Sequence, residues 1–407
     1  MPLRPSRPPR ILVLSFSPIH RDARVLREIQ ALCEVGEVTS VGYGPAPPQV
    51  AGHLRIPDSA PSLPQTPLGV VRLALRRLRA SETAAPAARA ALRLVREAGL
   101  GRFDMVVAND ARSIPTAFAI ADGAPVWADM HEWAPEERTH VTSWRLLVAP
   151  LMDHICRAYL PRCAAVTTVG GEIAGLYERR YGVAPRLVRN AAAFADLSPS
   201  EPAPDGRIRL VHSGGAVPGR AIEAMIDAVK ACDDRFTLDL FLVPGGDRGA
   251  YLDRLKDRAA GCERIAFPAP VAPGDLPRVL NAYDVGVFWI PPFNTNARLT
   301  LPNKIFDYVQ ARLAIAVGPT AEMVRLVDEY GLGVHSRTNE AADITATLMA
   351  LTVQDVVGYK RASHAAARAL SFERDKGTIR AIVSELTGSP AAAPGPEAPA
   401  PEEDSQR

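Results

Sequence analysis

Apolar residues along this chain gather in short runs, and the segments between the runs repeat their apolar positions every three or four residues. Short continuous runs predict strands buried on both faces, and the longer repeats predict amphipathic helices. The predicted strands are Ile11–Ser15, Val38–Gly42, Met105–Asn109, Val126–Asp129, Ala165–Val169, Leu187–Arg189, Ile208–His212, Leu238–Val243, Val285–Trp289 and Ala314–Val317. The clearest predicted helices are Asp22–Cys33, Ala221–Ala231 and Leu276–Ala282. This alternation predicts an α/β protein with parallel sheets.

The alternation stops once, in the stretch AAAFADLSPSEPAPDGR that follows Asn190. A chain of 407 residues is also too long for one ordinary core. We therefore predict two Rossmann-like, doubly wound domains facing a cleft, at residues 11–190 and 206–370, with a linker at residues 191–205. Residues 1–10 and 388–407 are predicted to be disordered tails, the second because it is rich in Pro and Ala.

Composition narrows the classes of function. The formal net charge is +2, which argues against nucleic acid as a partner. The five cysteines are scattered without a Cys-x-x-Cys pair, which argues against a zinc or redox site and favours a reducing compartment. No apolar run approaches the ~20 residues of a membrane helix, and the first run is too short for a signal peptide. We therefore predict a cytoplasmic protein that at most touches the inner face of the cytoplasmic membrane.

The stretch LTLPNKIFDY, residues 299–308, predicts a helix whose start can bind an anion. Thr300 can cap this helix, and Pro302 suits its first turn. A helix N-terminus offers unpaired N–H groups and about half a positive charge. The groups concerned are the N–H groups of Leu301, Asn303 and Lys304 and the Lys304 ammonium. Asp307, one turn on, is placed for sugar hydroxyls. The simpler interpretation, that Asp307 only favours the helix start and Lys304 is solvated, stays open.

Five stretches, in order along the chain, resemble a known family. They are RDARVLREIQAL, VWADMHEW, VTTVGGEIAGLYERRYGVAPRLVRNA, LVHSGGAVPGRAIEAMIDAV and LPNKIFDY. Together they are similar to retaining glycosyltransferases of family 4, which have the GT-B fold, and the likeness spans residues 10–387. The resemblance implies that a nucleotide-diphosphate sugar binds the C-terminal domain and an acceptor the N-terminal domain. It also implies that residues 371–387 form a helix that crosses back onto the N-terminal domain.

The resemblance assigns a donor site and shows where this chain departs from the family. Asp307 stands where the family binds the ribose. The residues expected at the diphosphate are Gly214, Gly215, Arg220, Leu301, Asn303 and Lys304. Gly215 replaces the family's Arg and Arg220 its Lys, although Arg220 also fits a surface position on the helix. Leu299 replaces a Glu that usually meets the donor sugar. Arg312 replaces a Gly after the helix, so we expect a different turn there.

His131 is the predicted centre of the reaction, because it follows a strand end and the family's His faces the donor sugar there. Asp129 or Glu132 could orient its imidazole. In this family the leaving phosphate is thought to deprotonate the acceptor, so His131 need not be a base. A structural His in a loop is the alternative. The pair Asn109 and Asp110 could face the same cleft.

Other positions are predicted to be structural. Asp22 is a good N-cap, and Arg24 is interpreted as a structural residue that can lie on the surface. Asn190 is interpreted as a hinge marker that closes the first domain through backbone hydrogen bonds. No Asp-x-Asp pair occurs in the sequence, so we predict no metal, and no cofactor besides the nucleotide sugar.

Residues 68–98 predict a basic amphipathic helix. The stretch from Pro67 to Gly99 carries seven Arg and two Glu between Leu, Val and Ala. Such a helix can lie on an anionic membrane. Packing on its own domain is an equally good interpretation, because the Ala-rich middle makes a shallow apolar face.

We therefore predict a retaining, metal-independent glycosyltransferase. Its acceptor could be a cell-envelope glycan, a glycolipid or a small natural product. One alternative is a non-catalytic homologue that acts as partner or scaffold, which Leu299 and Gly215 favour. A sugar-nucleotide epimerase is a further alternative, which the lost acid at Leu299 disfavours.

Overall fold

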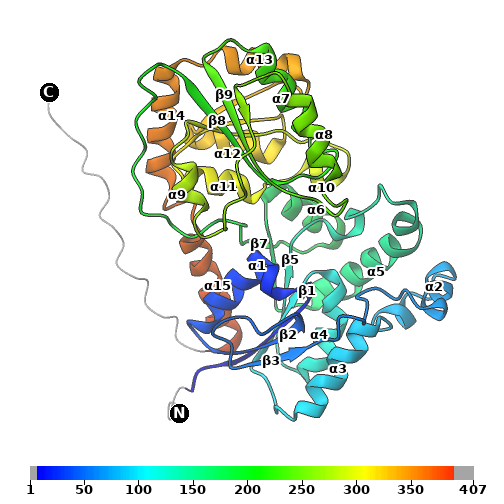
Figure 1. The fold of residues 1–407 in the computed structure, drawn as a ribbon. Coiled ribbons are helices and arrows are strands. Elements are labelled where there is room, and N and C mark those ends of the chain that lie inside the picture. The colour runs from blue at the N-terminus through cyan, green and yellow to red at the C-terminus, as the bar shows by residue number, and fades with distance from the viewer. Residues whose placement is uncertain (1–6, 389–407) are drawn as a thin grey trace.

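The structure is a computed structural model that describes residues 7–388. It consists of two domains that lie one above the other in Figure 1, each built on a parallel sheet. The first holds a seven-stranded sheet in the order β3-β2-β1-β4-β5-β6-β7, and the second a six-stranded sheet in the order β10-β9-β8-β11-β12-β13. This architecture confirms the predicted fold class, two Rossmann-like doubly wound domains.

The N-terminal domain places its central strands between helices. Its strands are β1 (Arg10–Pro18), β2 (Glu37–Tyr43), β3 (Gly52–Arg55), β4 (Met105–Asn109), β5 (Val126–Met130), β6 (Ala165–Thr168) and β7 (Arg186–Leu187). Its helices are α1 (Ala23–Cys33), α2 (Pro67–Ala74), α3 (Pro86–Ala98), α4 (Ile114–Ala121), α5 (Ala149–Tyr159) and α6 (Gly171–Tyr181).

The C-terminal domain repeats this plan. Its strands are β8 (Ile208–Gly215), β9 (Phe236–Val243), β10 (Ile265–Ala266), β11 (Val285–Phe288), β12 (Ala314–Val317) and β13 (Gly333–His335). The helices that follow β8 are α7 (Ile222–Ala231), α8 (Ala250–Ala259), α9 (Leu276–Leu280), α10 (Thr295–Arg298), α11 (Asn303–Gln310), α12 (Ala321–Tyr330), α13 (Ala341–Met349), α14 (Val353–Ala366) and α15 (Phe372–Thr387).

Each central strand is buried on both faces, which explains its continuous apolar run. In β1, Ile11 and Val13 join one apolar cluster, and Leu12 and Leu14 join the cluster on the opposite face. Side chains alternate across a strand, so a strand in the middle of such a sheet needs apolar residues at successive positions.

The ten predicted strands are all present, and the prediction missed β3, β10 and β13. These three strands lie at sheet edges. An edge strand pairs on one side only, and β3 is half-buried or exposed along its length, so it carries no apolar run. The observed end of a strand also differs from the predicted end where pairing with the neighbouring strand continues. For example, β8 extends to Gly215 because that residue still pairs with Val243 of β9.

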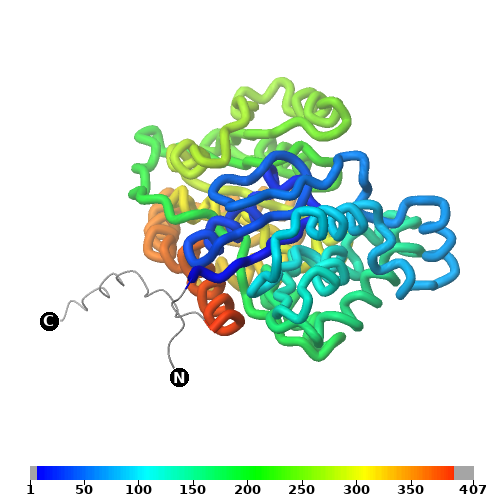
Figure 2. The backbone as a smooth tube through the Cα atoms, turned by 90° about the horizontal axis from the view of Figure 1, so that it is seen from below, coloured from blue at the N-terminus to red at the C-terminus, as the bar shows by residue number. Residues whose placement is uncertain are grey.

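The prediction of one helix over residues 68–98 is wrong, because the segment forms α2 and α3 with a break between them. Arg76 adopts a left-handed backbone (φ 55°), which ends α2, and Pro86 starts α3. The alanine face of α3, including Ala87 and Ala91, is fully buried in the N-terminal core. Only α2 projects from the side of the domain, as Figures 1 and 2 both show.

Helix α15 packs on the N-terminal sheet although it ends the C-terminal half. Phe372, Ile379 and Ile382 lie in the same apolar cluster as Ile11 and Val13 of β1, and Figure 2 shows this helix in red beside the blue N-terminal segment. No helix or strand occurs between β7 and β8. The predicted tails lie largely outside the described residues, but Arg10 already belongs to β1. Among the described residues no helix is long and apolar enough to cross a membrane.

Candidate active site between the two domains

The carboxyl ends of β1, β4 and β5 face the C-terminal domain across a cavity. The strand order of the first sheet changes direction between β1 and β4, where ligands of such sheets bind. The cavity measures about 470 Å³, and both domains line it: His131 and Glu132 follow β5, and Asn303 starts α11. The structure therefore brings two separately predicted stretches to one cleft.

The start of α11 is open, as an anion site requires. The residue at the N-cap is Pro302, and no side chain caps the helix. The predicted capping by Thr300 is thus wrong, because the chain stays extended for two more residues, to Pro302, before turning into the helix. The first N–H groups of a helix have no partner within it, so those of Asn303 and Lys304 are available for an anion.

Lys304 lies against Gly214, near the end of β8. A Cβ atom built on Gly214 would come within 2.5 Å of Lys304 Nζ, so only glycine leaves room for the ammonium there. The ammonium also lies 5.5 Å from the ring centre of Phe288. Burial and repulsion from Arg220 lower the pKa of Lys304 to about 8, against the opposing attraction of Asp307. Two cations therefore lie close enough to repel, as expected where they share an anionic ligand.

Asp307 is a half-buried carboxylate without a hydrogen bond to any described side chain or backbone group. Burial raises its pKa to about 6, although Lys304 and Arg27 attract its charge. A carboxylate kept charged without protein donors costs free energy that a ligand hydroxyl group can recover.

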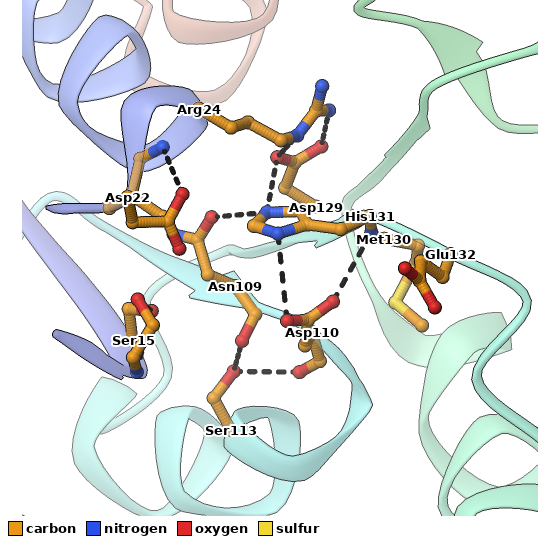
Figure 3. Close-up of polar contacts among 12 residues, drawn as sticks. Ser15, Asp22, Arg24, Asn109, Asp110, Ser113, Asp129, Met130, His131 and Glu132 are labelled. Atoms are coloured by element: carbon orange, nitrogen blue, oxygen red, sulfur yellow. Dashed lines mark hydrogen bonds and ion pairs between the residues drawn. The ribbon is translucent and has the colours of Figure 1, made fainter. Parts of the chain in front are cut away.

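His131 is enclosed by three acceptors from two strand ends, as Figure 3 shows. Its Nε2 lies 2.9 Å from Asn109 Oδ1 and 3.2 Å from Asp129 Oδ2. Its Nδ1 lies 3.6 Å from Asp110 Oδ2, and its backbone N–H donates to Asp110 Oδ1. Burial alone would lower the pKa of His131, but attraction to Asp110 and the hydrogen bond to Asp129 raise it to about 9. A raised pKa favours the imidazolium form of the ring at neutral pH.

Arg24 and Glu28 of α1 support this imidazolium from behind. The Arg24 guanidinium donates to both Asp129 oxygens, at 2.8 and 2.6 Å, and to the Val188 carbonyl. Arg24 is buried, so its predicted surface position is wrong. Glu28 accepts from the Asn109 amide at 2.8 Å. Burial and repulsion from Asp129 raise the pKa of Glu28 to about 8, so this carboxyl group is mostly protonated at pH 7.

Of the two predicted partners of His131, Asp129 makes the contact and Glu132 does not. Figure 3 shows Glu132 pointing away from the imidazole. Desolvation and repulsion from Glu137 and Asp110 raise the pKa of Glu132 to about 7, although much of its surface is open to the cleft. Asp22 does cap α1, since its side chain accepts from the Val25 N–H.

Other predicted residues lie differently. The side chain of Leu301 is buried in the C-terminal core and lines a separate cavity, so only its backbone remains available to a donor. Gly215 continues β8. Leu299 belongs to the apolar cluster of the N-terminal domain, which explains why this position is not an acid. Asn190 uses its side chain rather than its backbone, accepting from Arg27 and lining the cleft.

Arg312 adopts the turn that a glycine would make. Its φ is 62°, so the expectation of a different turn is wrong. The buried guanidinium donates to the carbonyls of Leu197, Val309 and Gln310, at 3.0, 3.1 and 2.8 Å, and to that of Ala195. These bonds offset the strain of a left-handed arginine and fix the segment between the domains against α11.

Contacts at the cleft rim hold the domains together. The Trp133 N–H donates to Asn296 Oδ1 at 2.7 Å, and Thr295 donates to Glu136. Glu322 of α12 accepts from the Glu172 N–H. All three join parts of the chain more than a hundred residues apart, so they tie the two domains to each other. No group of three or more His, Cys, Asp or Glu side chains among residues 7–388 is arranged to hold a metal ion.

Comparisons with known proteins agree with this architecture. Residues 37–192 match the model of Glycosyltransferase Family 4. The matched stretch lies mostly within the N-terminal domain. HepE of Anabaena, solved with UDP and glucose, aligns at 14% identity with a TM-score of 0.66, covering 93% of this chain and 100% of that one.

Two further solved structures share the fold. Sucrose-phosphate synthase from Thermosynechococcus elongatus aligns at 12% identity and a TM-score of 0.68, covering 93% of this chain and 99% of that one. The α,α-trehalose 6-phosphate synthase from Burkholderia multivorans aligns at 13% identity with a TM-score of 0.61, covering 94% of this chain and 99% of that one. A search of curated protein sequences gave no match. The predicted GT-B glycosyltransferase fold is confirmed.

Proposed function

We propose that this chain is a family 4 glycosyltransferase, which transfers a sugar from a UDP-sugar donor in the C-terminal domain to an acceptor held by the N-terminal domain. The observation that carries the proposal is the 470 Å³ cavity, which has His131 on one wall and the start of α11 on the other. HepE, of the same fold, was solved with UDP-glucose, and this supports UDP as the nucleotide.

In this proposal the diphosphate binds the open N–H groups of α11, with Lys304 and Arg220 as its cations. Asp307 accepts hydrogen bonds from the ribose. The family's Arg is absent at Gly215, and Lys304, which crosses the neighbouring Gly214, supplies the second positive charge instead. No metal or other cofactor takes part.

The reaction would retain the configuration of the sugar. The bond from the anomeric carbon to the β-phosphate oxygen breaks, and the acceptor oxygen bonds to that carbon on the same face. The acceptor proton passes to the departing phosphate. His131, an imidazolium at neutral pH, donates a hydrogen bond to a sugar hydroxyl and so orients the sugar. Asp129 and Asp110 keep the imidazolium charged and fixed, while Glu132 borders the cleft.

We also propose that the protein works in the cytoplasm, at the inner face of the cytoplasmic membrane. The part of residues 68–98 suited to that contact is α2, which exposes Leu68, Val71 and Leu75 beside Arg76 and Arg77. Exposed apolar side chains among arginines favour an anionic lipid surface.

The test of donor binding is thermal unfolding of the purified chain with UDP, GDP, ADP, dTDP or CMP, without added metal. A ligand specific for the folded state adds about 2.7 kcal/mol at a hundred times its dissociation constant. We expect UDP to raise the midpoint, and Asp307→Ala to abolish the rise. Asp253→Ala, at an exposed acid in the first turn of α8, is the matched control and should keep it.

A non-catalytic homologue is the second candidate, favoured by the packing of Leu299 into the N-terminal core. No shift with any nucleotide would favour this candidate. UDP binding together with hydrolysis or transfer of the sugar would exclude it.

A further inference from the structure

The N-terminal domain contains a second, larger cavity with a strongly basic wall. It measures about 720 Å³ and lies at the carboxyl ends of β1 and β2, beside the segment that leads to α2. Among its charged lining residues are Arg21, Arg55, Arg112 and Arg138, against the carboxylate of Asp58. The wall therefore carries excess positive charge.

Three of these arginines are not neutralised by that carboxylate. Asp58 pairs with Arg55 at 2.6 Å. Arg112 donates to Ser62 at 3.3 Å, and its nearest carboxylate, Glu137, is 4.0 Å away.

The other two are freer still. Arg21 makes no hydrogen bond or ion pair within residues 7–388. The Arg138 guanidinium lies 5.9 Å from the ring centre of Trp144, and its charge also acts on Glu137. Guanidinium groups that line one cavity with few carboxylate partners fit the oxygens of a phosphate.

This basic cavity continues into the proposed reaction centre. Pro18 and Arg21 line both the basic cavity and the 470 Å³ cleft that contains His131. Arg112 also lines a small cavity of 140 Å³ together with His131 and Glu132. A molecule in the basic cavity can therefore reach the sugar from the acceptor side, opposite the start of α11.

The opposite end of the cavity is apolar. Leu63, Gln65 and Arg138 also line a cavity of about 310 Å³, whose other walls include Leu73 of α2 and Trp144. A ligand that follows both cavities would place a charged group among the arginines and an apolar part beneath α2.

We propose that the acceptor carries a phosphate group, bound by Arg21, Arg112 and Arg138. That the bound molecule is the acceptor rests on the proposed function. The phosphate site itself does not depend on it. The phosphate can belong to a soluble sugar phosphate, which would fill the basic cavity alone, or to a lipid, whose apolar part would occupy the second cavity.

The experiment measures binding to the full chain by titration calorimetry and vesicle flotation. The probes are glucose 6-phosphate, glucose, and phosphatidylcholine vesicles with or without phosphatidic acid. All titrations use saturating UDP, and are repeated in Lys304→Gln so that phosphate at the start of α11 does not contribute. We expect binding of a phosphate-bearing probe and none of glucose or of pure phosphatidylcholine.

Arg21→Gln, Arg112→Gln and Arg138→Gln should each weaken that binding about tenfold, as loss of a charge-assisted hydrogen bond does. Arg89→Gln, at an exposed arginine on α3, is the matched control and should not change it. An unchanged midpoint of thermal unfolding in each variant shows that the fold is intact.

Glucose 6-phosphate binding would identify a soluble acceptor, and binding restricted to phosphatidic acid vesicles would identify a lipid. The proposal is overturned if neither phosphate probe binds at millimolar concentration, if glucose binds equally well, or if the three Gln variants bind like the control. Phosphate binding without any UDP binding would leave this site standing while the proposed donor chemistry fails.

Discussion

Replacing Asp110 by Asn should lower the pKa of His131 and with it the stability of the protein at neutral pH. Burial opposes protonation of His131, and attraction to Asp110 is the largest effect that favours it. A rise in pKa from 6.5 to about 9 corresponds to about 3 kcal/mol. Because the folded-state pKa lies above the unfolded value, this stabilisation is fully present below pH 6.5 and is lost as the pH rises through about 9.

The substitution is conservative in every other respect. Asn keeps the shape of Asp110 and still offers Oδ1 to the His131 N–H. Asn also has the same Cβ atom as Asp, so the positive-φ backbone at this position (φ 65°, ψ 157°) crowds it no more than it crowds Asp110. The change therefore removes one charge, 3.6 Å from the imidazole, and with it part of the repulsion that raises the pKa of Glu132.

Two assays measure the effect: carbon-13 NMR of labelled histidine gives the pKa, and urea unfolding at pH 6 and 9.5 gives the stability. We expect the variant to lower the pKa by about one pH unit and to reduce the pH-dependent stability loss by about 1 kcal/mol. Glu28 and Lys304 also titrate near pH 8, so the variant is compared with the wild type at each pH.

Glu82→Gln is the control, because Glu82 pairs with another histidine, His154, at 2.7 Å. A wild-type His131 pKa near 6.5, or an unchanged pKa in Asp110→Asn, refutes the reasoning.

The remaining predictions concern the donor side. Since the pKa of Asp307 is about 6, UDP affinity should fall from pH 7 to pH 5, and Asp307→Asn should bind weakly without that pH dependence, as calorimetry can show. Gly214→Ala should displace the Lys304 ammonium and weaken UDP binding about tenfold. Arg312→Ala should lower the free energy of unfolding in urea by about 3 kcal/mol, and Arg312→Gly by less, because glycine relieves the left-handed backbone.

A different outcome would refute each of these three predictions. Equal affinity at pH 5 and 7 would remove Asp307 from the ribose. Gly246→Ala, at a glycine with open space around it, is the control for Gly214→Ala, and equal affinities of the two would mean that Lys304 does not bind the nucleotide. Equal stability of Arg312→Ala and wild type would mean that its carbonyl contacts contribute nothing.

Central strands were predictable because their burial on both faces leaves a continuous apolar run. Met105–Asn109 and Ala314–Val317 were predicted with the bounds that the structure has. The edge strand β3 was not, since pairing rather than composition defines it. The break after α2 was missed as well. An arginine with a left-handed backbone leaves no mark in the sequence, although Pro86 could have indicated a new helix start.

The residues of the candidate site likewise fall into those that were predicted from the sequence and those that were missed. His131 was predicted because it follows a strand end, and Asp307 because it lies one turn into a helix whose start can bind an anion. Arg24 and Glu28 were missed because their partners, Asp129 and Asn109, lie about a hundred residues away. The available signal was their spacing of four, which puts both on the buried face of α1 with Val25. Polar residues on an apolar helix face need partners.

The position of α15 has a consequence for the order in which the protein is made. The N-terminal sheet lies at the start of the chain, yet Phe372, Ile379 and Val383 complete the apolar layer over one of its faces. A ribosome synthesises the entire C-terminal domain before it delivers that helix. Until then the layer formed by Ile11 and Val13 lacks part of its cover. The first domain to emerge is therefore the last to be finished, and a chain truncated before residue 372 would leave an apolar face open to chaperones or to other copies of itself.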